Sequence, residues 1–229
     1  MAKIMLIAGF GSGISLSVAE RFGSQGFTLA LVARNPERLA EGKSTLAAKG
    51  IRAEAFPADI SDPATAEAVV ATVREKLGPI TVLLWNAYAA AAGDLLTVDA
   101  ATLRSLFDVP VISLVKAVQA ALPDLKTQKD AAVLVTNGGL GLIDPAVDAT
   151  AVGWGAMGLS LANAAKHKLC GLLSAKLAPD GIYVGEVIVL HTVKGTAWDN
   201  GTATLEAKTV AASFWDVYKD RKPPFVTVG

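Results

Sequence analysis

A glycine-rich turn near the N-terminus carries the clearest chemistry in the sequence. A short apolar run, Lys3–Ala8, leads into Gly9-Phe10-Gly11-Ser12-Gly13-Ile14-Ser15 and then into an amphipathic segment. Glycines allow a tight turn, and the first turn of the following helix offers free N–H groups and positive dipole to a pyrophosphate. A tight turn without a ligand is the alternative. The place of these glycines between a predicted strand and a predicted helix favours a nucleotide-binding loop.

Residues after the next two predicted strands indicate which nucleotide this loop would hold. Arg34 and Asn35 follow Phe27–Ala33, and no carboxylate stands where a ribose 2′-hydroxyl would need a partner. Arg34 can instead face a 2′-phosphate, which favours NADP(H) over NAD(H), unless it is only an exposed loop arginine. Asp59 and Ile60 follow the third strand, where a carboxylate can accept a hydrogen bond from an adenine amine or simply begin a turn.

These residues need a sheet to bring them together, and strands alternate with helices along the chain. Apolar strands that are separated by helices predict a parallel sheet covered on both faces, within one domain over residues 1–229. The predicted strands are Lys3–Ala8, Phe27–Ala33, Ile51–Phe56, Ile80–Trp85, Ala132–Thr136 and Tyr183–Leu190. The predicted helices are Ile14–Phe22, Pro36–Lys49, Pro63–Leu77, Asp99–Leu122 and Ala156–Leu177, with Asn35 capping the second.

The composition narrows the possible partners and the compartment. The 229 residues include 21 basic and 21 acidic side chains, so there is no basic excess to bind nucleic acid. A single cysteine, Cys170, cannot form an internal disulfide, which fits a reducing, cytoplasmic location. The longest uncharged stretch, 149–165, carries several glycines and falls short of the ~20 apolar residues of a membrane span. It is therefore predicted to be a buried helix, and no membrane association is expected.

In order and spacing, the glycine loop and the segments LVARNPERL, ADISD, GPITVLLWNA and KLAPDGIYV resemble the short-chain dehydrogenase/reductase family over residues 3 to about 190. The resemblance implies a Rossmann-type, doubly wound α/β fold of about seven strands, a small-molecule substrate and a homodimer or homotetramer. Ala8 replaces the threonine of the family loop T-G-x-x-x-G-x-G and Ser15 its last glycine. The candidate cofactor-binding residues are Gly9, Gly11, Ser12, Gly13, Ile14, Arg34, Asn35, Asp59, Ile60, and Asn86 and Ala87 from the family's Asn-Asn-Ala-Gly motif.

The chain departs from the family at its catalytic positions. The family uses a tyrosine as general acid or base, a lysine four residues on that lowers the tyrosine pKa, a serine and an asparagine. Counting back from KLAPDGIYV places Leu159 at the tyrosine position and Asn163 at the lysine position. Gly138 falls at the serine position and Pro110 at the asparagine position. We therefore expect a divergent member in which all four roles are vacated.

Few side chains remain that could replace these groups. Tyr88 and His191 follow predicted strands and are weak candidates for a proton donor, although a packed lid aromatic and a hydrogen-bonded loop histidine are the simpler interpretations. Lys166 lies one turn beyond Asn163 and is interpreted as an exposed helix lysine. Other polar groups at the same edge are those of Thr136, Asn137 and Thr196. His167 and Cys170 share a helix face without further ligands, so no metal site is expected.

Three hypotheses follow for function. The first is an atypical NADP(H)-dependent oxidoreductase that acts on a small carbonyl or alcohol substrate. The second is a catalytically degenerate nucleotide-binding protein that serves as a sensor or scaffold, because removal of a positioned acid or base typically lowers rates about 10²–10⁴-fold. The third is a structural dimer partner without nucleotide, suggested by Ser15 and Trp85 crowding the site.

Overall fold

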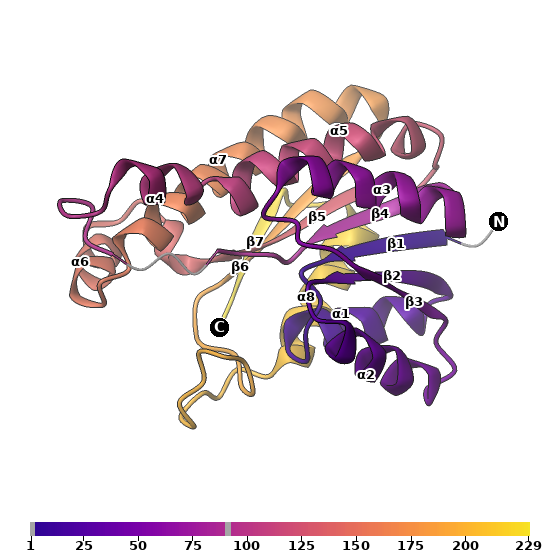
Figure 1. Ribbon diagram of the computed structural model, residues 1–229, viewed down its shortest axis with the longest axis horizontal. Coiled ribbons are helices and arrows are strands. Elements are labelled where there is room, and N and C mark those ends of the chain that lie inside the picture. The colour runs from indigo at the N-terminus through magenta and orange to yellow at the C-terminus, as the bar shows by residue number, and fades with distance from the viewer. Residues whose placement is uncertain (1–2, 90–92) are drawn as a thin grey trace.

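The computed structural model describes residues 3–89 and 93–229, which form a seven-stranded parallel sheet in the order β3-β2-β1-β4-β5-β6-β7 (Figure 1). The order reverses beside β1, which is the doubly wound arrangement predicted from the sequence. The strands are β1 (Lys3–Ala8), β2 (Phe27–Ala33), β3 (Ala53–Pro57), β4 (Ile80–Trp85), β5 (Ala132–Gly138), β6 (Tyr183–Val189) and β7 (Phe225–Val228).

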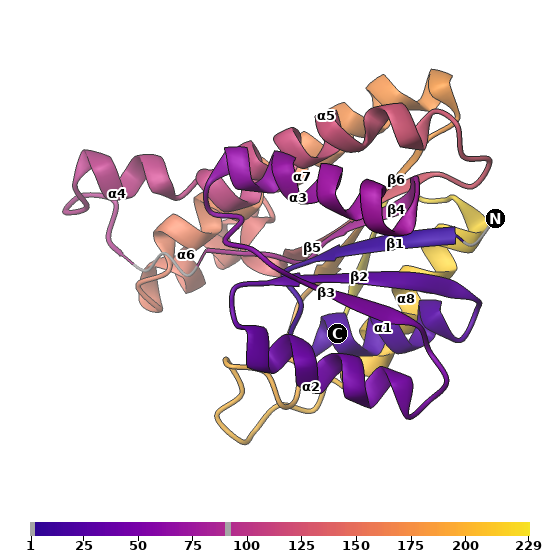
Figure 2. The same cartoon turned by 45° about the vertical axis from the view of Figure 1, so that its right-hand side comes forward.

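Helices cover both faces of the sheet, so the strands are apolar on both sides. In Figures 1 and 2, α3, α5 and α7 lie on one face and α1, α2 and α8 on the other. Two buried clusters correspond to these layers, one around Val70, Val118 and Cys170, the other around Phe22 and Phe214. The helices are α1 (Ile14–Gly23), α2 (Pro36–Ala47), α3 (Pro63–Leu77), α4 (Ala100–Ser105), α5 (Leu114–Leu125), α6 (Pro145–Gly153), α7 (Met157–Leu177) and α8 (Ala207–Asp220).

Side-chain caps explain where several of these helices begin. The Asn35 Oδ1 accepts a hydrogen bond from the Arg38 N–H at 2.6 Å, which confirms the predicted cap of α2. Asp62 caps α3 by accepting from the N–H groups of Ala64 and Thr65 at 3.1 and 3.2 Å. Such caps satisfy first-turn N–H groups that have no partner within the helix.

Two predicted helices are broken in the structure. The helix predicted over Asp99–Leu122 consists of α4, a π-helical turn over Asp108–Ser113 and α5. Pro110 lies in that turn, where its missing N–H interrupts the α-helical ladder. The stretch 149–165, predicted as one buried helix, is divided between α6 and α7, because the chain turns at Gly155 with a φ of +60°.

Smaller differences concern the ends of elements and the C-terminal region. The third strand begins at Ala53 instead of Ile51, the fifth continues to Gly138, and the sixth ends at Val189. After β6, α8 packs against α1, and β7 then completes the sheet at its outer edge. Phe214 and Tyr218 of α8 are buried, whereas Phe225 of β7 is 46% exposed.

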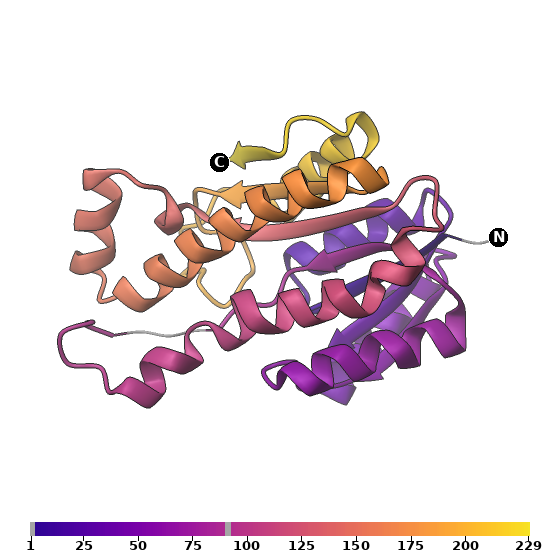
Figure 3. The same ribbon diagram turned by 90° about the horizontal axis from the view of Figure 1, so that it is seen from above.

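Three segments extend past the carboxyl ends of the strands. Figure 3 shows α4 and α6 projecting together beyond the sheet, and the loop 190–206 lies below them in Figure 1. A bridge between Gly93 and Ala156 joins the segment before α4 to the start of α7. The edge at which a ligand of a parallel sheet is bound is therefore framed by these segments.

One helical stretch within the described residues, Ala100–Leu125, is long and apolar enough to cross a membrane by length and composition alone. In the fold, this stretch contains the π-helical turn, and its α5 portion packs against β4 and α3. Its apolar residues Leu114, Ala117, Val118 and Ala121 are buried against the sheet. Its hydropathy is therefore explained by its place as a covering helix.

A buried carboxylate joins this layer to the sheet. The Asp124 side chain in α5 is 7% exposed, and its Oδ1 accepts from the Arg74 Nε at 2.6 Å. Its Oδ2 accepts from the N–H of Ile80 at 3.1 Å, at the start of β4. Asp124 therefore holds α3, α5 and β4 together.

We expect Asp124→Ala to lower the free energy of unfolding by about 2–3 kcal/mol, because it leaves the Ile80 N–H and the Arg74 guanidinium without their partner. The control is Asp130→Ala, which removes a 2.7 Å ion pair to Lys3 whose side chains are 46% and 45% exposed. Its cost should be below about 1 kcal/mol. Urea unfolding at neutral pH measures both, and equal losses would contradict the role given to Asp124.

Candidate functional site

The glycine loop follows β1 and is held between the ends of two neighbouring strands. The N–H groups of Gly9 and Phe10 both donate to the Val32 carbonyl of β2, at 3.0 and 2.9 Å. Gly9 has a φ of +83°, and a Cβ on it would lie 2.5 Å from the backbone nitrogen of Ala87, just after β4. A side chain at Gly9 is therefore excluded twice, by backbone conformation and by the close approach.

Ser15 stands where the family loop has its last glycine, and it closes the loop on itself. Its buried hydroxyl accepts from the Gly11 N–H at 2.8 Å and donates to the Gly11 carbonyl at 3.1 Å. At the start of α1, Gly13 provides no side-chain cap, which leaves first-turn N–H groups directed out of the helix end. Ser12 beside it is exposed and Ile14 is half-buried.

Phe10 anchors this loop in a way that the sequence did not reveal. The Phe10 ring is 5% exposed and packs over Gly42 of α2, where a Cβ would lie 2.2 Å from the ring. The Gly-Lys-Ser sequence at this glycine resembles part of a phosphate loop, but it lies inside α2. Gly42 thus serves to admit the phenylalanine that fixes the nucleotide loop against the helix.

Arg34 and Asp59 lie near each other at the ends of β2 and β3. Arg34 is exposed, and Asn35 beside it uses its side-chain oxygen to cap α2. Hydrogen bonds from the Ser61 hydroxyl (2.8 Å) and N–H (3.1 Å) lower the pKa of Asp59, and the charge of Arg34 lowers it further. Ile60 is 7% exposed and packs in the core, so its side chain faces inward.

Asn86 joins three strand ends at the point where the sheet order reverses. Its N–H donates to the Ala8 carbonyl at 2.8 Å, and its Nδ2 donates to the Gly9 carbonyl at 3.0 Å. Its Oδ1 accepts from the Thr136 hydroxyl of β5 at 2.8 Å. Because these groups are engaged, Asn86 positions the strand ends, while Ala87 forms the wall against which Gly9 packs.

Gly138 and Asn163, predicted from the sequence to stand at the family's serine and lysine positions, adjoin in space. A Cβ on Gly138 would lie 2.9 Å from the Asn163 Nδ2. A Cβ on Gly141 would lie 2.6 Å from the Asn163 backbone carbon, so α7 packs closely on the chain after β5. With Leu159 one turn before Asn163, and Pro110 in the π-helical turn, none of the four positions carries an acid or base.

Tyr88 and the loop 190–206 meet at the same edge. The Tyr88 phenol, on a ring that is 48% exposed, accepts a hydrogen bond from the Trp198 Nε1 at 3.2 Å. Thr196 of this loop packs over Gly13 at the start of α1. His191 is exposed and lies beside Gly229 at the C-terminus. Tyr88 is therefore bonded to the same loop whose Thr196 packs over the start of α1, whereas the neighbour found for His191 is the C-terminal residue.

An aspartate organises this loop from within. The Asp199 carboxylate accepts from the N–H groups of Gly195 and Gly201, both at 2.8 Å, and of Ala203 at 3.1 Å. These hydrogen bonds lower the pKa of Asp199, so the carboxylate stays ionised at neutral pH. A bridge between Val193 and Leu205 closes the base of the loop.

Two expectations about polar and aromatic side chains are wrong. Lys166, interpreted as an exposed helix lysine, is 2% exposed, and burial lowers its pKa to about 8. It lies near Glu186 of β6, which is also buried; the available signal was the single acidic residue within an otherwise apolar strand. Trp85, expected to crowd the site, packs in the core beneath α3 and α5.

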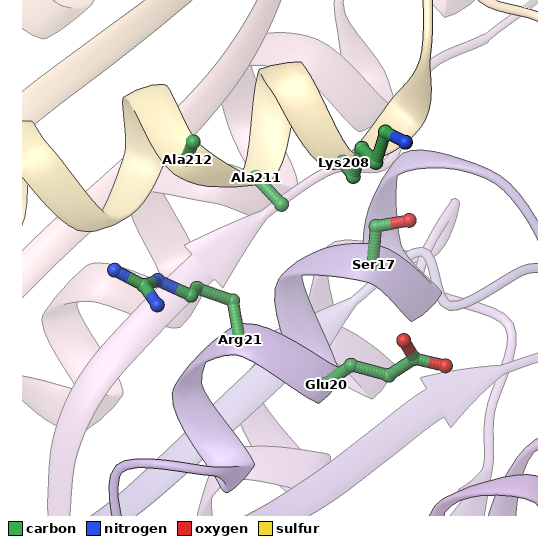
Figure 4. Close-up of a pocket in the computed structure, with 6 residues that line it drawn as sticks. All are labelled: Ser17, Glu20, Arg21, Lys208, Ala211 and Ala212. Atoms are coloured by element: carbon green, nitrogen blue, oxygen red, sulfur yellow. The ribbon is translucent and has the colours of Figure 1, made fainter.

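A surface hollow between α1 and α8 lies apart from these groups. Figure 4 shows its lining, in which the Arg21 and Lys208 side chains extend from opposite helices and Glu20 points outward. The lining residues are Ser17, Glu20, Arg21, Lys208, Ala211 and Ala212. None of them belongs to the candidate cofactor or catalytic positions, so the hollow adds nothing to the site.

The reversed strand order, with a glycine turn after β1 and a helix N-terminus behind it, defines a Rossmann-type nucleotide-binding fold. A family model described as short chain dehydrogenase matches residues 3–190. The chain belongs to the short-chain dehydrogenase/reductase family of oxidoreductases.

Relatives and solved structures agree with this assignment. A 2,3-dihydro-2,3-dihydroxybenzoate dehydrogenase from Bacillus subtilis (strain 168) is 43% identical over 82 residues, 36% of this chain, and the match spans only 31% of that relative's length. A short-chain dehydrogenase from Sphingobium yanoikuyae in complex with NADPH superposes with a TM-score of 0.82 at 25% identity, covering 98% of this chain and 87% of that one.

A third comparison is with an NADPH-bound short chain oxidoreductase from Pseudomonas aeruginosa PAO1 that contains an atypical catalytic center. Its TM-score is 0.85 at 20% identity, and the superposition covers 99% of this chain and 95% of that chain. At this identity the likeness shows a shared fold.

We expect Gly9→Ala to lower the free energy of unfolding by about 2–4 kcal/mol, because the new Cβ meets Ala87 at a positive φ. Gly11→Ala is the matched control in the same loop, since a Cβ there has no atom within 4 Å. Its cost should stay below about 1 kcal/mol. Denaturant unfolding of both variants provides the measurement, and a neutral Gly9→Ala would contradict the geometry of the loop.

Proposed function

We propose that this protein is an NADP(H)-dependent oxidoreductase with an atypical active site, acting on a small carbonyl or alcohol substrate. The observation that carries the proposal is the glycine loop at Gly9, whose backbone packs directly against Ala87 at the end of β4 because it carries no side chain. A loop kept this close to the strand ends, with an uncapped helix N-terminus behind it, is suited to a pyrophosphate.

The residues around the loop suit each part of the nucleotide. The first-turn N–H groups of α1, with Gly11, Ser12 and Gly13 before them, would hold the pyrophosphate. Arg34 would pair with a 2′-phosphate, and Asp59 would accept from the adenine amine through the carboxylate oxygen that Ser61 leaves free. The NADPH bound to the Sphingobium yanoikuyae relative supports this choice of cofactor.

When bound, the nicotinamide would supply or accept a hydride at the substrate carbon. The chain's own contribution is to orient this half of the cofactor beside Asn86 and Ala87 and to deliver a proton. Since Gly138, Leu159 and Asn163 provide no acid or base, the proton would come from water or from the Tyr88 phenol, with His191 as the weaker candidate. Tyr88 is held by Trp198 at 3.2 Å, which orients its hydroxyl.

A catalytically degenerate nucleotide-binding protein is the second candidate. It is favoured by the lack of an acid or base at Pro110, Gly138, Leu159 and Asn163. A fold that keeps the glycine loop without these groups would still bind nucleotide. In either case, we propose that residues 1–229 act as one cytoplasmic dinucleotide-binding domain. Exposed Leu161 and Leu172 on α7 support a homodimer or homotetramer.

Turnover separates the two candidates. NADPH consumption is measured with wild-type protein over a panel of aldehydes, ketones and quinones. The oxidoreductase is expected to consume NADPH with at least one class of substrate, and Tyr88→Phe should lower that rate about 10²-fold or more if the phenol is the acid. NADPH binding without any consumption would instead establish the degenerate protein.

We expect Arg34→Ala to weaken NADPH binding roughly tenfold or more, because it removes a charge-assisted contact to the 2′-phosphate. NADH, which lacks that phosphate, should bind the variant as it binds the wild type. Arg38→Ala is the control, because Arg38 is also exposed and lies four residues further on, in the first turn of α2. This variant should leave both affinities unchanged. Fluorescence titration at low salt gives all the values; an unchanged NADPH affinity in Arg34→Ala would refute the preference for NADP(H).

A further inference from the structure

A buried polar cluster lies directly behind the vacated catalytic positions, between α7 and the strands β5 and β6. It consists of Asn137, Lys166, His167 and Glu186. The side chains of Asn137, Lys166 and Glu186 belong to residues that are only 3%, 2% and 1% exposed. Buried charges are expensive unless they are compensated, so a cluster of this kind needs a reason beyond packing.

Glu186 is the centre of the cluster. Its Oε1 accepts from the Asn137 Nδ2, and its Oε2 lies at hydrogen-bond distance from the His167 Nδ1, both at 2.6 Å. His167 is the member that reaches the surface, with its side chain 33% exposed and its ring edge against Phe225. The carboxylate therefore has a defined partner on each oxygen.

Asn137 connects this carboxylate to both vacated positions. Its Nδ2 also donates to the Asn163 carbonyl at 3.0 Å, and its Oδ1 accepts from the Gly138 N–H at 3.0 Å. Gly138 stands at the family's serine position and Asn163 at its lysine position. One amide side chain therefore fixes the backbone at the two places where the family has side chains that act on substrate and cofactor.

Lys166 adds a second buried charged side chain near this carboxylate. It lies on the same face of α7 as Asn163, and its pKa is lowered to about 8 by burial, an effect that the nearby Glu186 carboxylate opposes. An ammonium and a carboxylate are therefore both buried behind the two vacated positions.

We propose that Asn137, Glu186 and Lys166 form a positioning cluster that holds Gly138 and Asn163 in place beneath the nicotinamide half of the cofactor. In this proposal, buried side chains behind the site order the backbone at these two positions, where the family has catalytic side chains in the site itself. This inference rests on the proposed NADP(H) binding. It assigns no acid–base step to the cluster, and Asn137 and Glu186 act through the backbone that they fix.

Comparing two probes isolates this role. NADPH has a nicotinamide half, whereas adenosine 2′,5′-bisphosphate carries only the adenosine half, which would contact Arg34 and Asp59. Asn137→Ala, Glu186→Gln and Lys166→Met should each weaken NADPH binding roughly tenfold while the affinity for adenosine 2′,5′-bisphosphate stays at the wild-type value. Lys168→Met, an exposed lysine of the same helix, should change neither affinity.

The double variant Lys166→Met/Glu186→Gln provides a rescue that a general loss of structure would not show. It removes both charges but keeps an acceptor for Asn137 and a partner for His167, so it should recover most of the NADPH affinity lost by each single change. Single variants that weaken both probes equally, or neither, would overturn the inference. A wild-type protein that binds neither probe would overturn the proposed function, and this inference with it.

Discussion

The close approach of Gly9 to Ala87 is the contact on which the rest of the site depends. The turn after β1 touches the end of β4, at the point where the strand order reverses. The start of α1 follows this turn and therefore lies at the same edge of the sheet. Asn86 strengthens this contact by bonding to Ala8, Gly9 and Thr136. The nucleotide loop is therefore built from backbone and small side chains, so its shape does not depend on the side chains at the predicted catalytic positions.

The strands and the parallel sheet could be predicted from the sequence because apolar strands and helices alternate in local signals, whereas the doubly wound arrangement was an implication of the family resemblance. Apolar strands and capped helices are visible in a short window, and Asn35 is an example of a cap that the structure confirms. The broken helix around Pro110 was harder, since one proline is compatible with a kink, a break or a π-helical turn. The packing against α3 and β4, which decides among these outcomes, is not encoded within that window.

The candidate site likewise contains residues that local sequence predicts and residues whose surroundings depend on the tertiary fold. Gly9, Arg34 and Asp59 are predicted as site residues from their places after strands, and the structure brings all three to one edge, where the charge of Arg34 lowers the pKa of Asp59. Lys166 was misjudged because helical periodicity states which residues share a face but not that the face opposes a buried acid. The nearby Glu186 is 20 positions further on and lies on a different element, so their proximity follows only from the tertiary fold.

The buried charges also bear on the low charge of the chain as a whole. A parallel sheet covered on both faces leaves few places for charged residues, and here two of them occupy the core behind the site. A core filled only for stability would have apolar residues at these positions, since well-packed apolar replacements are often as stable as a buried ion pair. Keeping a glutamate there has a structural consequence instead: its carboxylate accepts from Asn137, which also binds the Asn163 carbonyl and the Gly138 N–H. The backbone positions of Gly138 and Asn163 therefore depend on buried side chains that lie outside the proposed substrate site.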